Sequence, residues 1–219
     1  VVPKKIRCCG SLNHHLGKEN DAHQDFRNNI NTWYEEHQKG NLDAILSNTS
    51  GCGTTMKDYG FIFKNDKKMK KKAKVISDLT KDVSEYLNTS LKLDFKSKKK
   101  KYKIAYHSAC SMQHGQKVHN QPMELLSKTD NEVMEIPEGH ICCGSAGTYN
   151  ILQTEIAKEL LSKKVKNIES LKPDFISTGN IGCITQISNG TKTPILHTIE
   201  ILDWYTGGLK PIILQKNQI

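Results

Sequence analysis

Seven cysteines are the residues of this 219-residue sequence that are best suited to chemistry. Two adjacent pairs, Cys8–Cys9 and Cys142–Cys143, are each followed by glycine and serine, and single cysteines stand at Cys52, Cys110 and Cys183. An odd number of cysteines leaves at least one thiol without a disulfide partner. The start of the sequence, VVPKKIRCCG, shows no apolar run of the secretion-signal type, and a reducing compartment disfavours disulfides. The cysteines therefore predict metal binding or redox chemistry.

An adjacent cysteine pair is an unusual metal-binding arrangement. Structural zinc sites usually take thiolates from cysteines separated by about two to four residues. Neighbouring side chains of an extended segment point to opposite sides, so the pair would have to bend sharply to hold one small ion. A larger iron–sulfur cluster also takes thiolate ligands and spans more space. The alternative is a tight turn with buried free thiols. The expected metal ligands are Cys110, Cys142, Cys143 and Cys183 in one site, and Cys8, Cys9 and Cys52 in a second.

The glycines after the second pair suit such a site. Gly144 and Gly147 allow the backbone to approach a bound group closely, and we expect both to be cofactor-binding residues. The helix that should follow them would direct free N–H groups and the positive end of its dipole toward anionic sulfur.

The histidines are less informative than the cysteines. His107 and His114 lie on either side of Cys110 and could be ligands or hydrogen-bond donors, although a histidine in a polar loop or in the core is commoner. His14 and His15 follow the first cysteine pair, but the second pair has no histidine at the matching positions. We find no serine–histidine–aspartate order, phosphate-binding glycine loop or pair of carboxylates. No catalytic residue is therefore predicted.

The cysteines also belong to an internal repeat. The segment LDAILSNTSGC (42–52) follows the first CCGS (8–11), and PDFISTGNIGC (173–183) follows the second CCGS (142–145) at a similar distance. Both segments end in Gly-Cys and share an aspartate and an isoleucine at matching positions. Only the second copy has an upstream cysteine, Cys110, because the first CCGS stands so near the start. We therefore expect the chain to begin inside its first repeat, as the C-terminal part of a longer protein.

The elements that must position these cysteines follow the same order in both copies. Apolar residues at helical spacing predict helices over 26–37 and 156–171, and the apolar runs at 44–47 and 175–178 predict strands. Alternating helices and strands are typical of an α/β fold, in which sites form at the carboxyl ends of parallel strands. We expect two pseudo-repeated CCG modules with mainly parallel sheets flanked by helices, the first module truncated at its N-terminus. Further strands are expected at 103–108, 132–137 and 194–199.

The expected domain limits follow from the repeat and from a lysine-rich stretch between its copies. We predict a first, N-terminally incomplete module over 1–93 and a basic linker over 94–101. A second, complete module is predicted over 102–206, followed by a C-terminal tail over 207–219.

The chain is basic, with 32 lysines and arginines against 23 aspartates and glutamates and a formal net charge of +9. Most of the excess lies in two runs, 64–74 and 96–103. We find no aromatic interleaving and no nucleic-acid-binding motif, so no nucleic-acid partner is expected. We expect a solvated surface or linker, with docking to an acidic partner or an anionic lipid surface as the alternative. No apolar stretch approaches the roughly 18 residues of a membrane span.

The positions of the second cysteine set resemble the cysteine-rich CCG domain, read here as Cys110, Cys142–Cys143–Gly144 and Gly182–Cys183. That domain occurs in pairs in heterodisulfide reductases, in lactate-utilisation proteins and in the iron–sulfur subunits of glycolate oxidase. Stretches such as CCGSLNHHLG, SGCGTTMKDYG, CCGSAGTYNILQ and NIGCITQISNGTKTPILHTIEIL are similar to the C-terminal half of the last group. The resemblance covers nearly the whole chain.

This resemblance implies an electron-transfer subunit that carries an iron–sulfur cluster of the [4Fe–4S] type. A flavoprotein subunit with FAD would oxidise glycolate, or a similar acid such as D-lactate, and pass electrons through this subunit toward the respiratory chain. The implied location is cytoplasmic, with possible peripheral association with the inner face of the cytoplasmic membrane. Members of the family also have an N-terminal ferredoxin-like domain, which this sequence does not include.

Two alternatives to electron transfer stay open. The heterodisulfide reductase modules end in C-x-x-C, and neither Cys52 nor Cys183 is followed by that spacing. One alternative is therefore a non-redox scaffold with zinc-bound or empty sites. The other is a disulfide-reducing subunit like the heterodisulfide reductases.

Overall fold

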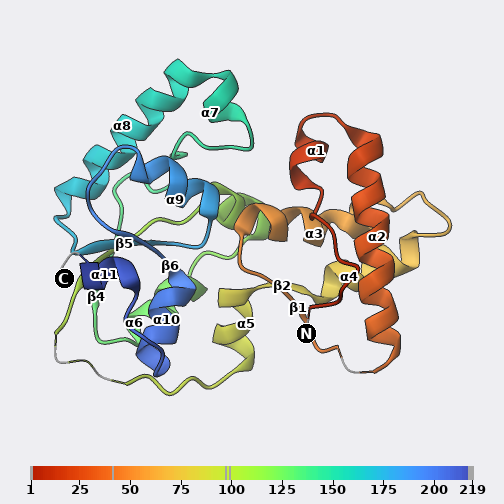
Figure 1. Cartoon of the computed structure of the whole chain (residues 1–219), viewed down its shortest axis with the longest axis horizontal. Helices are drawn as coiled ribbons and strands as arrows, with labels where there is room; N and C mark the ends of the chain where they lie inside the picture. The colour runs from red at the N-terminus through yellow and green to blue at the C-terminus, as the bar shows by residue number, and fades with distance from the viewer. Residues whose placement is uncertain (1, 41, 97, 99, 217–219) are drawn as a thin grey trace. The chain divides into compact units, whose positions relative to one another are not determined.

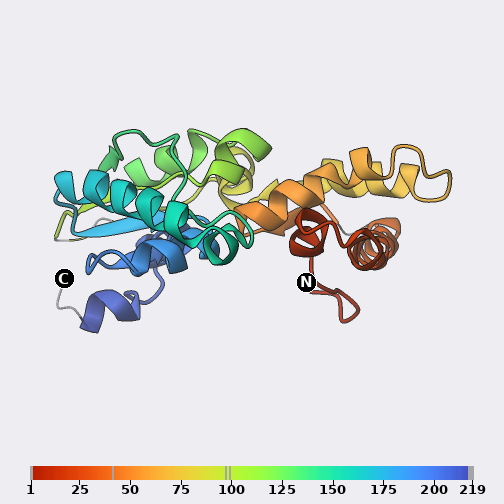
Figure 2. The same ribbon diagram turned by 90° about the horizontal axis from the view of Figure 1, so that it is seen from above.

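The computed structural model divides into two compact units, residues 1–82 and residues 83–219, and each unit is described by itself (Figure 1). Its elements are drawn in Figure 1 and, after a quarter turn, in Figure 2. The structure describes all residues except 1, 41, 97, 99 and 217–219.

The second unit is built on a parallel sheet with the strand order β4-β3-β5-β6 among the described residues. All of its strands fall inside segments that the sequence predicts as strands, and β5 is buried along its whole length. Its first two residues, Phe175 and Ile176, are apolar, and the hydroxyl of the buried Ser177 is paired with that of Thr198 at 3.0 Å. The predicted α/β fold with a mainly parallel sheet is therefore confirmed. The strands are β3 (Lys103–Tyr106), β4 (Glu132–Glu135), β5 (Phe175–Thr178) and β6 (Ile195–His197).

Helices cover both faces of this sheet, with α6 and α10 on one side and α8 and α9 on the other (Figure 1). Successive side chains of a strand point to opposite faces, so Ile104 packs in the first layer and Ala105 in the second. The helices of this unit are α5 (Val83–Ser90), the π-helix η1 (Ser111–Gln116), α6 (Gln121–Ser127), α7 (Tyr149–Leu152), α8 (Thr154–Ser170), α9 (Ile181–Ser188), α10 (Thr198–Thr206) and α11 (Ile212–Lys216).

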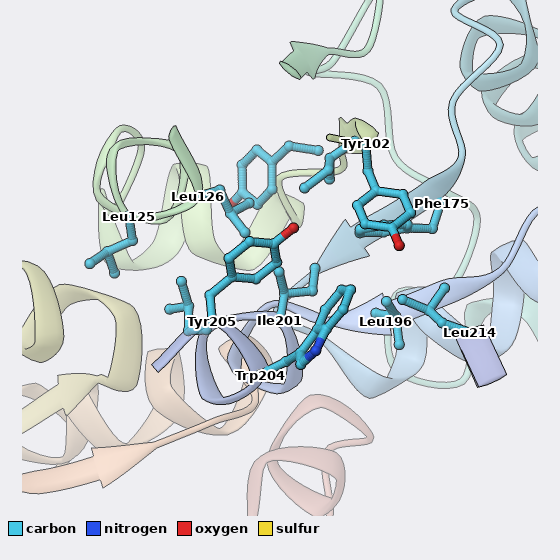
Figure 3. Packing of buried hydrophobic residues seen from close by; sticks show 12 residues of the cluster. Tyr102, Leu125, Leu126, Phe175, Leu196, Ile201, Trp204, Tyr205 and Leu214 are labelled. Atoms are coloured by element: carbon cyan, nitrogen blue, oxygen red, sulfur yellow. The ribbon is translucent and has the colours of Figure 1, made fainter. Parts of the chain in front are cut away.

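An aromatic cluster fills the layer beneath α6 and α10 (Figure 3). The ring centroid of Tyr102 lies 5.5 Å from that of Phe175 and 5.8 Å from that of Trp204. Trp204 in turn lies 4.9 Å from Tyr205, whose hydroxyl donates a hydrogen bond to Asn131 at 3.0 Å. Such aromatic pairs contribute about 0.5–1.5 kcal/mol each beyond their buried area. The cluster therefore holds β3 beside β5 and fixes where their carboxyl ends lie.

The second unit begins earlier in the sequence than the module predicted over 102–206. Helix α5 packs against α6, and Leu87, Leu93 and Phe95 pack against the aromatic cluster. Leu214 of α11 is fully buried in the same layer. Segments expected to be the end of the first module, a linker and a tail thus complete this core, because their apolar side chains cover the sheet. Residues 97, 99 and 217–219 of the predicted linker and tail lie outside the described residues.

The first unit is a helical layer with a short parallel pair of strands. Strand β1 pairs with β2 in parallel, and β1 lies inside the run predicted at 44–47. Phe26, Ile30 and Tyr59 are fully buried in its core. Helices α3 and α4 lie side by side in both views. The elements are α1 (Ser11–His15), α2 (Glu19–Gln38), β1 (Ile45–Ser47), α3 (Ser50–Ile62), α4 (Lys70–Leu79) and β2 (Thr80–Asp82).

The first basic run, 64–74, forms the loop before α4 and the start of that helix. Met69 and Ala73 are buried, whereas most of the lysines around them are exposed. An amphipathic helix of this kind places its charges in water, as expected for a solvated surface. Within the described part of the chain, no helix is both long enough and apolar enough to cross a membrane.

Candidate metal centre

Four of the predicted ligands lie just beyond the carboxyl ends of the parallel strands. Cys110 follows β3, Cys142 and Cys143 follow β4, and Cys183 lies in the first turn of α9, after β5. Since β3 lies between β4 and β5 in the sheet, the three connections meet at one edge. These residues are called the second-unit cysteine cluster below.

Two sulfurs of the second-unit cysteine cluster are in direct contact. The sulfur atoms of Cys143 and Cys183 lie 3.4 Å apart, and these residues are only 2% and 3% exposed. Cys110 and Cys142 are partly buried and lie near enough to each other that each shifts the pKa of the other. The structure thus brings the four predicted ligands of this unit together.

The pKa values of Cys110 and Cys142, the first pair in this cluster, are shifted in opposite directions. The hydrogen bond from Cys110, followed by one from Cys143, lowers the pKa of Cys142 to about 2. The backbone N–H of Gly144, 3.3 Å from the Cys142 sulfur, acts in the same direction. The same contact with Cys142, together with burial, raises the pKa of Cys110 well above its usual range. Near neutral pH, Cys142 is therefore a thiolate and Cys110 its hydrogen-bond donor.

The pKa values of the second pair, Cys143 and Cys183, are also shifted in opposite directions. A hydrogen bond from Cys143 lowers the pKa of Cys183 to about 5 against the opposing effect of burial, and His107 adds to the lowering. Contacts with Cys142 and then Cys183, together with burial, raise the pKa of Cys143 well above its usual range. Two thiolates held by two thiols make an electron-rich pocket of the kind that binds cations.

His107 is a candidate ligand that sequence reasoning considered and set aside. It is 2% exposed, and its ligand nitrogen lies within 4.8 Å of the sulfurs of Cys143 and Cys183. The His107 ring lies close enough to Cys183 to lower the pKa of that thiol, although neither ring nitrogen has a hydrogen bond of normal geometry. The backbone N–H of His107 donates to the Ser177 carbonyl at 2.8 Å. A buried imidazole whose polar atoms are incompletely paired costs free energy unless something else binds it. The feature of the sequence that could have identified His107 as a ligand is its position near the end of the predicted strand 103–108. His114 is exposed and points to no such role.

The two predicted cofactor-binding glycines differ in the structure. Gly144 is buried with φ of +94°, and a Cβ atom there would lie 2.6 Å from the Ala157 carbonyl oxygen of α8. Gly147 is exposed with φ of +57°, and nothing lies within 4 Å of the position of its Cβ. Gly144 therefore allows α8 to pack against the cysteine turn, while its own N–H reaches sulfur. The backbone N–H of Ser145 likewise favours the thiolate of Cys143 and lowers its pKa. These donors lie in the turn itself, before α7 begins.

In the first unit, two of the three predicted ligands meet. The sulfurs of Cys9 and Cys52 lie 3.0 Å apart, and this contact raises the pKa of Cys9 and lowers that of Cys52. Cys8 is exposed, but its thiol also affects the pKa of Cys9. The Tyr59 hydroxyl donates to the Cys9 carbonyl at 2.8 Å, and the Asn29 side chain donates to the Cys8 carbonyl at 2.8 Å.

The turn of the first unit repeats one detail of the second. The backbone N–H of Ser11 lowers the pKa of Cys9, as that of Ser145 lowers the pKa of Cys143. His14 and His15, which follow this turn, border a cavity with Asp58 rather than the cysteines. The repeat seen in the sequence is thus also a repeat of local structure.

Comparisons with known proteins agree with the repeat. The family model described as "CCG: Cysteine-rich domain" matches residues 1–57 and 104–188, which together contain all seven cysteines. The chain is 36% identical to the glycolate oxidase iron-sulfur subunit of Escherichia coli (strain K12), over 93% of this chain and 50% of that protein. It is 28% identical to the probable glycolate oxidase iron-sulfur subunit of Bacillus subtilis (strain 168), over 87% of this chain and 42% of that protein.

A second group of relatives is matched over more of its length. The chain is 25% identical to lactate utilization protein A of Geobacillus sp. (strain WCH70), over 92% of this chain and 84% of that protein. The chain therefore spans half of the Escherichia coli glycolate oxidase subunit but most of this lactate utilization protein. With both cysteine sets matched and two turns of one local structure, the chain belongs to the cysteine-rich CCG-domain family.

Proposed function

We propose that this chain is the iron–sulfur electron-transfer part of a glycolate oxidase complex. Its cluster would be of the [4Fe–4S] type, held by Cys110, Cys142, Cys143 and Cys183. The observation that carries the proposal is that these four cysteines follow separate strands and meet at one edge of the sheet, where the sulfurs of Cys143 and Cys183 lie 3.4 Å apart. The similarity to a protein named as a glycolate oxidase iron-sulfur subunit supports it.

The donor set fits such a cofactor. Thiolates are the ligands of iron–sulfur clusters, and Cys142 and Cys183 have pKa values of about 2 and about 5. When bound, a cluster would supply a carrier that accepts and releases single electrons. The N–H of Gly144 donates to the Cys142 sulfur and that of Ser145 lowers the pKa of Cys143, so both favour added negative charge. Burial of Cys143 and Cys183 keeps water from the inner side.

In the proposed complex, substrate oxidation takes place on a flavoprotein subunit with FAD. That subunit would oxidise glycolate to glyoxylate, or D-lactate to pyruvate, and this chain would pass the electrons toward the respiratory chain. We propose a cytoplasmic location, with peripheral association with the inner face of the cytoplasmic membrane. The sites of Cys8, Cys9 and Cys52 would be the corresponding part of a first module. No residue of this chain is proposed as catalytic.

Analysis of the anaerobically purified full chain tests this proposal. We expect stoichiometric iron and acid-labile sulfide and an EPR signal on reduction. The variants Cys142→Ser and Cys183→Ser should lose this signal, whereas Cys52→Ser should affect only a site in the first unit. Addition of glycolate or D-lactate to a mixture with the flavoprotein should then reduce the cluster, and the faster of the two identifies the substrate. A wild-type chain without iron and sulfide would refute the proposal.

A second candidate function is a non-redox scaffold that holds zinc. The ligand atoms of His107, Cys143 and Cys183 lie within 4.8 Å of one another, which is compact enough for one tetrahedral ion. One zinc ion per chain without iron, and no loss of electron transfer in Cys183→Ser, would favour this function over the first.

A further inference from the structure

We infer that Gln113 is a positioning residue of the second-unit cysteine cluster, and that its side-chain amide sets the spacing between Cys110 and the Cys142–Cys143 pair. The inference rests on the proposed function and adds to it the contact that holds two ligand-bearing loops together. Gln113 acts through the backbone of these loops and is not itself proposed as a ligand.

The sheet joins the two loops that carry these cysteines only as far as its edge. Strands β3 and β4 pair in parallel up to Tyr106 and Glu135. Cys110 follows Tyr106 after a short loop, and Cys142 follows Glu135 after a longer one. A set of ligands must be held within about 0.5 Å of its working geometry. A contact beyond the last strand pair must therefore fix the separation of these loops.

The Gln113 side chain bonds to both loops. Its Nε2 atom lies 2.9 Å from the carbonyl oxygen of Ser108, in the loop that leads to Cys110. The same atom lies 3.3 Å from the carbonyl oxygen of Gly139, in the loop that leads to Cys142. A glutamine amide has two N–H donors, so Gln113 can donate to both carbonyl oxygens at once. One side chain thus connects the backbone of the two loops.

The π-helix η1 determines where this side chain lies. Gln113 is half-buried in η1, which begins directly after Cys110. Its amide donates to the carbonyl five residues earlier in the sequence, which is also the interval of the backbone hydrogen bonds in a π-helix. Such helices are rare and often occur at functional sites. The helix that starts at one ligand therefore directs the Gln113 amide back to the loop before that ligand.

The loop before Cys142 forms a closed turn, so a bond to that turn also positions the cysteine. The carbonyl oxygen of Glu138, whose φ is +53°, accepts a hydrogen bond from the N–H of Ile141 at 2.9 Å and closes the turn. Gly139 lies inside this turn, and its carbonyl oxygen also lies 3.5 Å from the Nζ of Lys164. The turn ends directly before Cys142, so the bond to Gly139 helps to place this ligand.

Co²⁺ binding to the reduced, metal-free full chain, followed by visible absorption, tests the inference. Gln113→Met keeps the length of the side chain and removes both donors. Gln113→Glu keeps the shape, but an ionised carboxylate accepts hydrogen bonds and cannot donate them. Both variants should bind Co²⁺ about 10–100-fold more weakly, the usual loss for residues that orient metal ligands. His114→Ala is the matched control, because His114 is the exposed neighbour on η1, and it should keep the wild-type affinity.

A double-mutant cycle separates positioning from a general loss of structure. When Cys110 is replaced by alanine, the spacing of the two loops no longer decides how many thiolates reach the ion. Gln113→Met should then weaken Co²⁺ binding by at most about twofold. In the chain that keeps Cys110, the thiolate-to-cobalt charge-transfer band of Gln113→Met should fall to the intensity found for Cys110→Ala, because Cys110 no longer reaches the ion.

The outcomes distinguish this inference from the proposed function. Co²⁺ affinities of both Gln113 variants equal to that of the wild type would overturn the inference. An equal loss of affinity with and without Cys110 would overturn it as well, because Gln113 would then support the fold and not the spacing of the ligands. A wild-type chain purified anaerobically without iron and sulfide would refute the proposed function alone, since the Co²⁺ cycle still decides the role of Gln113.

Discussion

Replacing Gly144 by alanine should destabilise the second unit much more than replacing Gly147. Both glycines have positive φ, +94° and +57°, where an L-residue costs about 1–2 kcal/mol. Only at Gly144 would the new methyl group meet neighbouring atoms, 2.6 Å from the Ala157 carbonyl oxygen and 3.1 Å from the Gln186 amide nitrogen. The Ala157 oxygen belongs to helix backbone and cannot rotate away, so overpacking adds about 1–3 kcal/mol. The expected losses are about 2–5 kcal/mol for Gly144→Ala and about 1–2 kcal/mol for Gly147→Ala.

Urea unfolding of the reduced chain measures this difference. With Trp33 replaced by phenylalanine, fluorescence reports on Trp204, which is 7% exposed in the core of the second unit. The transition midpoint should fall in both variants, and further for Gly144→Ala, with an unchanged slope. If the two variants lose the same stability, or if Gly144→Ala loses less than about 1 kcal/mol, the argument from helix packing is refuted.

Three further outcomes test other parts of the structure. Because the pKa of Cys142 is lowered to about 2 and that of Cys110 is raised, Cys142 and not Cys110 is a thiolate at about pH 6. Iodoacetamide should therefore alkylate Cys142 faster in the metal-free chain, and equal rates by peptide mass spectrometry would contradict the assignment. His107→Ala should weaken Co²⁺ binding by about 10–100-fold, as followed by visible absorption, if His107 contributes to the site; unchanged affinity would remove it from the site. Phe175→Ala should lower the unfolding free energy by about 3–5 kcal/mol, because Phe175 is buried. Phe61 is exposed, so Phe61→Ala should lower it by less than about 0.5 kcal/mol, and calorimetry measures both losses.

The sequence by itself determined the local elements and the chemical types of the site. Short runs that contain apolar residues predicted β3, β5 and β6, although the buried second half of β5 is Ser177 and Thr178. The duplicated CCGS and Gly-Cys motifs predicted two related cysteine turns. Because Cys110, Cys142, Cys143 and Cys183 follow separate predicted strands of an α/β fold, they were expected in one place.

The domain limits were decided by packing that the local pattern does not contain. Helix α5 lies in the segment predicted as the end of the first module, and its contact with α6 assigns it to the second unit. Phe95 and Leu214 read as parts of a linker and a tail, but they cover the sheet face of the second unit. A short apolar run in the sequence shows that its side chains need to be buried, but it does not show which unit they pack against.

The charges of the site were also decided by tertiary structure. Lys164 stands on the apolar face of α8, four residues before Ile168, and this spacing was the available signal in the sequence. The pattern cannot show whether a lysine at such a position extends to water or stays buried, because its long side chain allows both. The fold places its ammonium group at the carbonyls of Glu138 and Gly139. It likewise places His107, distant in sequence from Cys143 and Cys183, beside their sulfurs. Residue types therefore specified a thiolate site, and long-range packing specified which other charges and donors surround it.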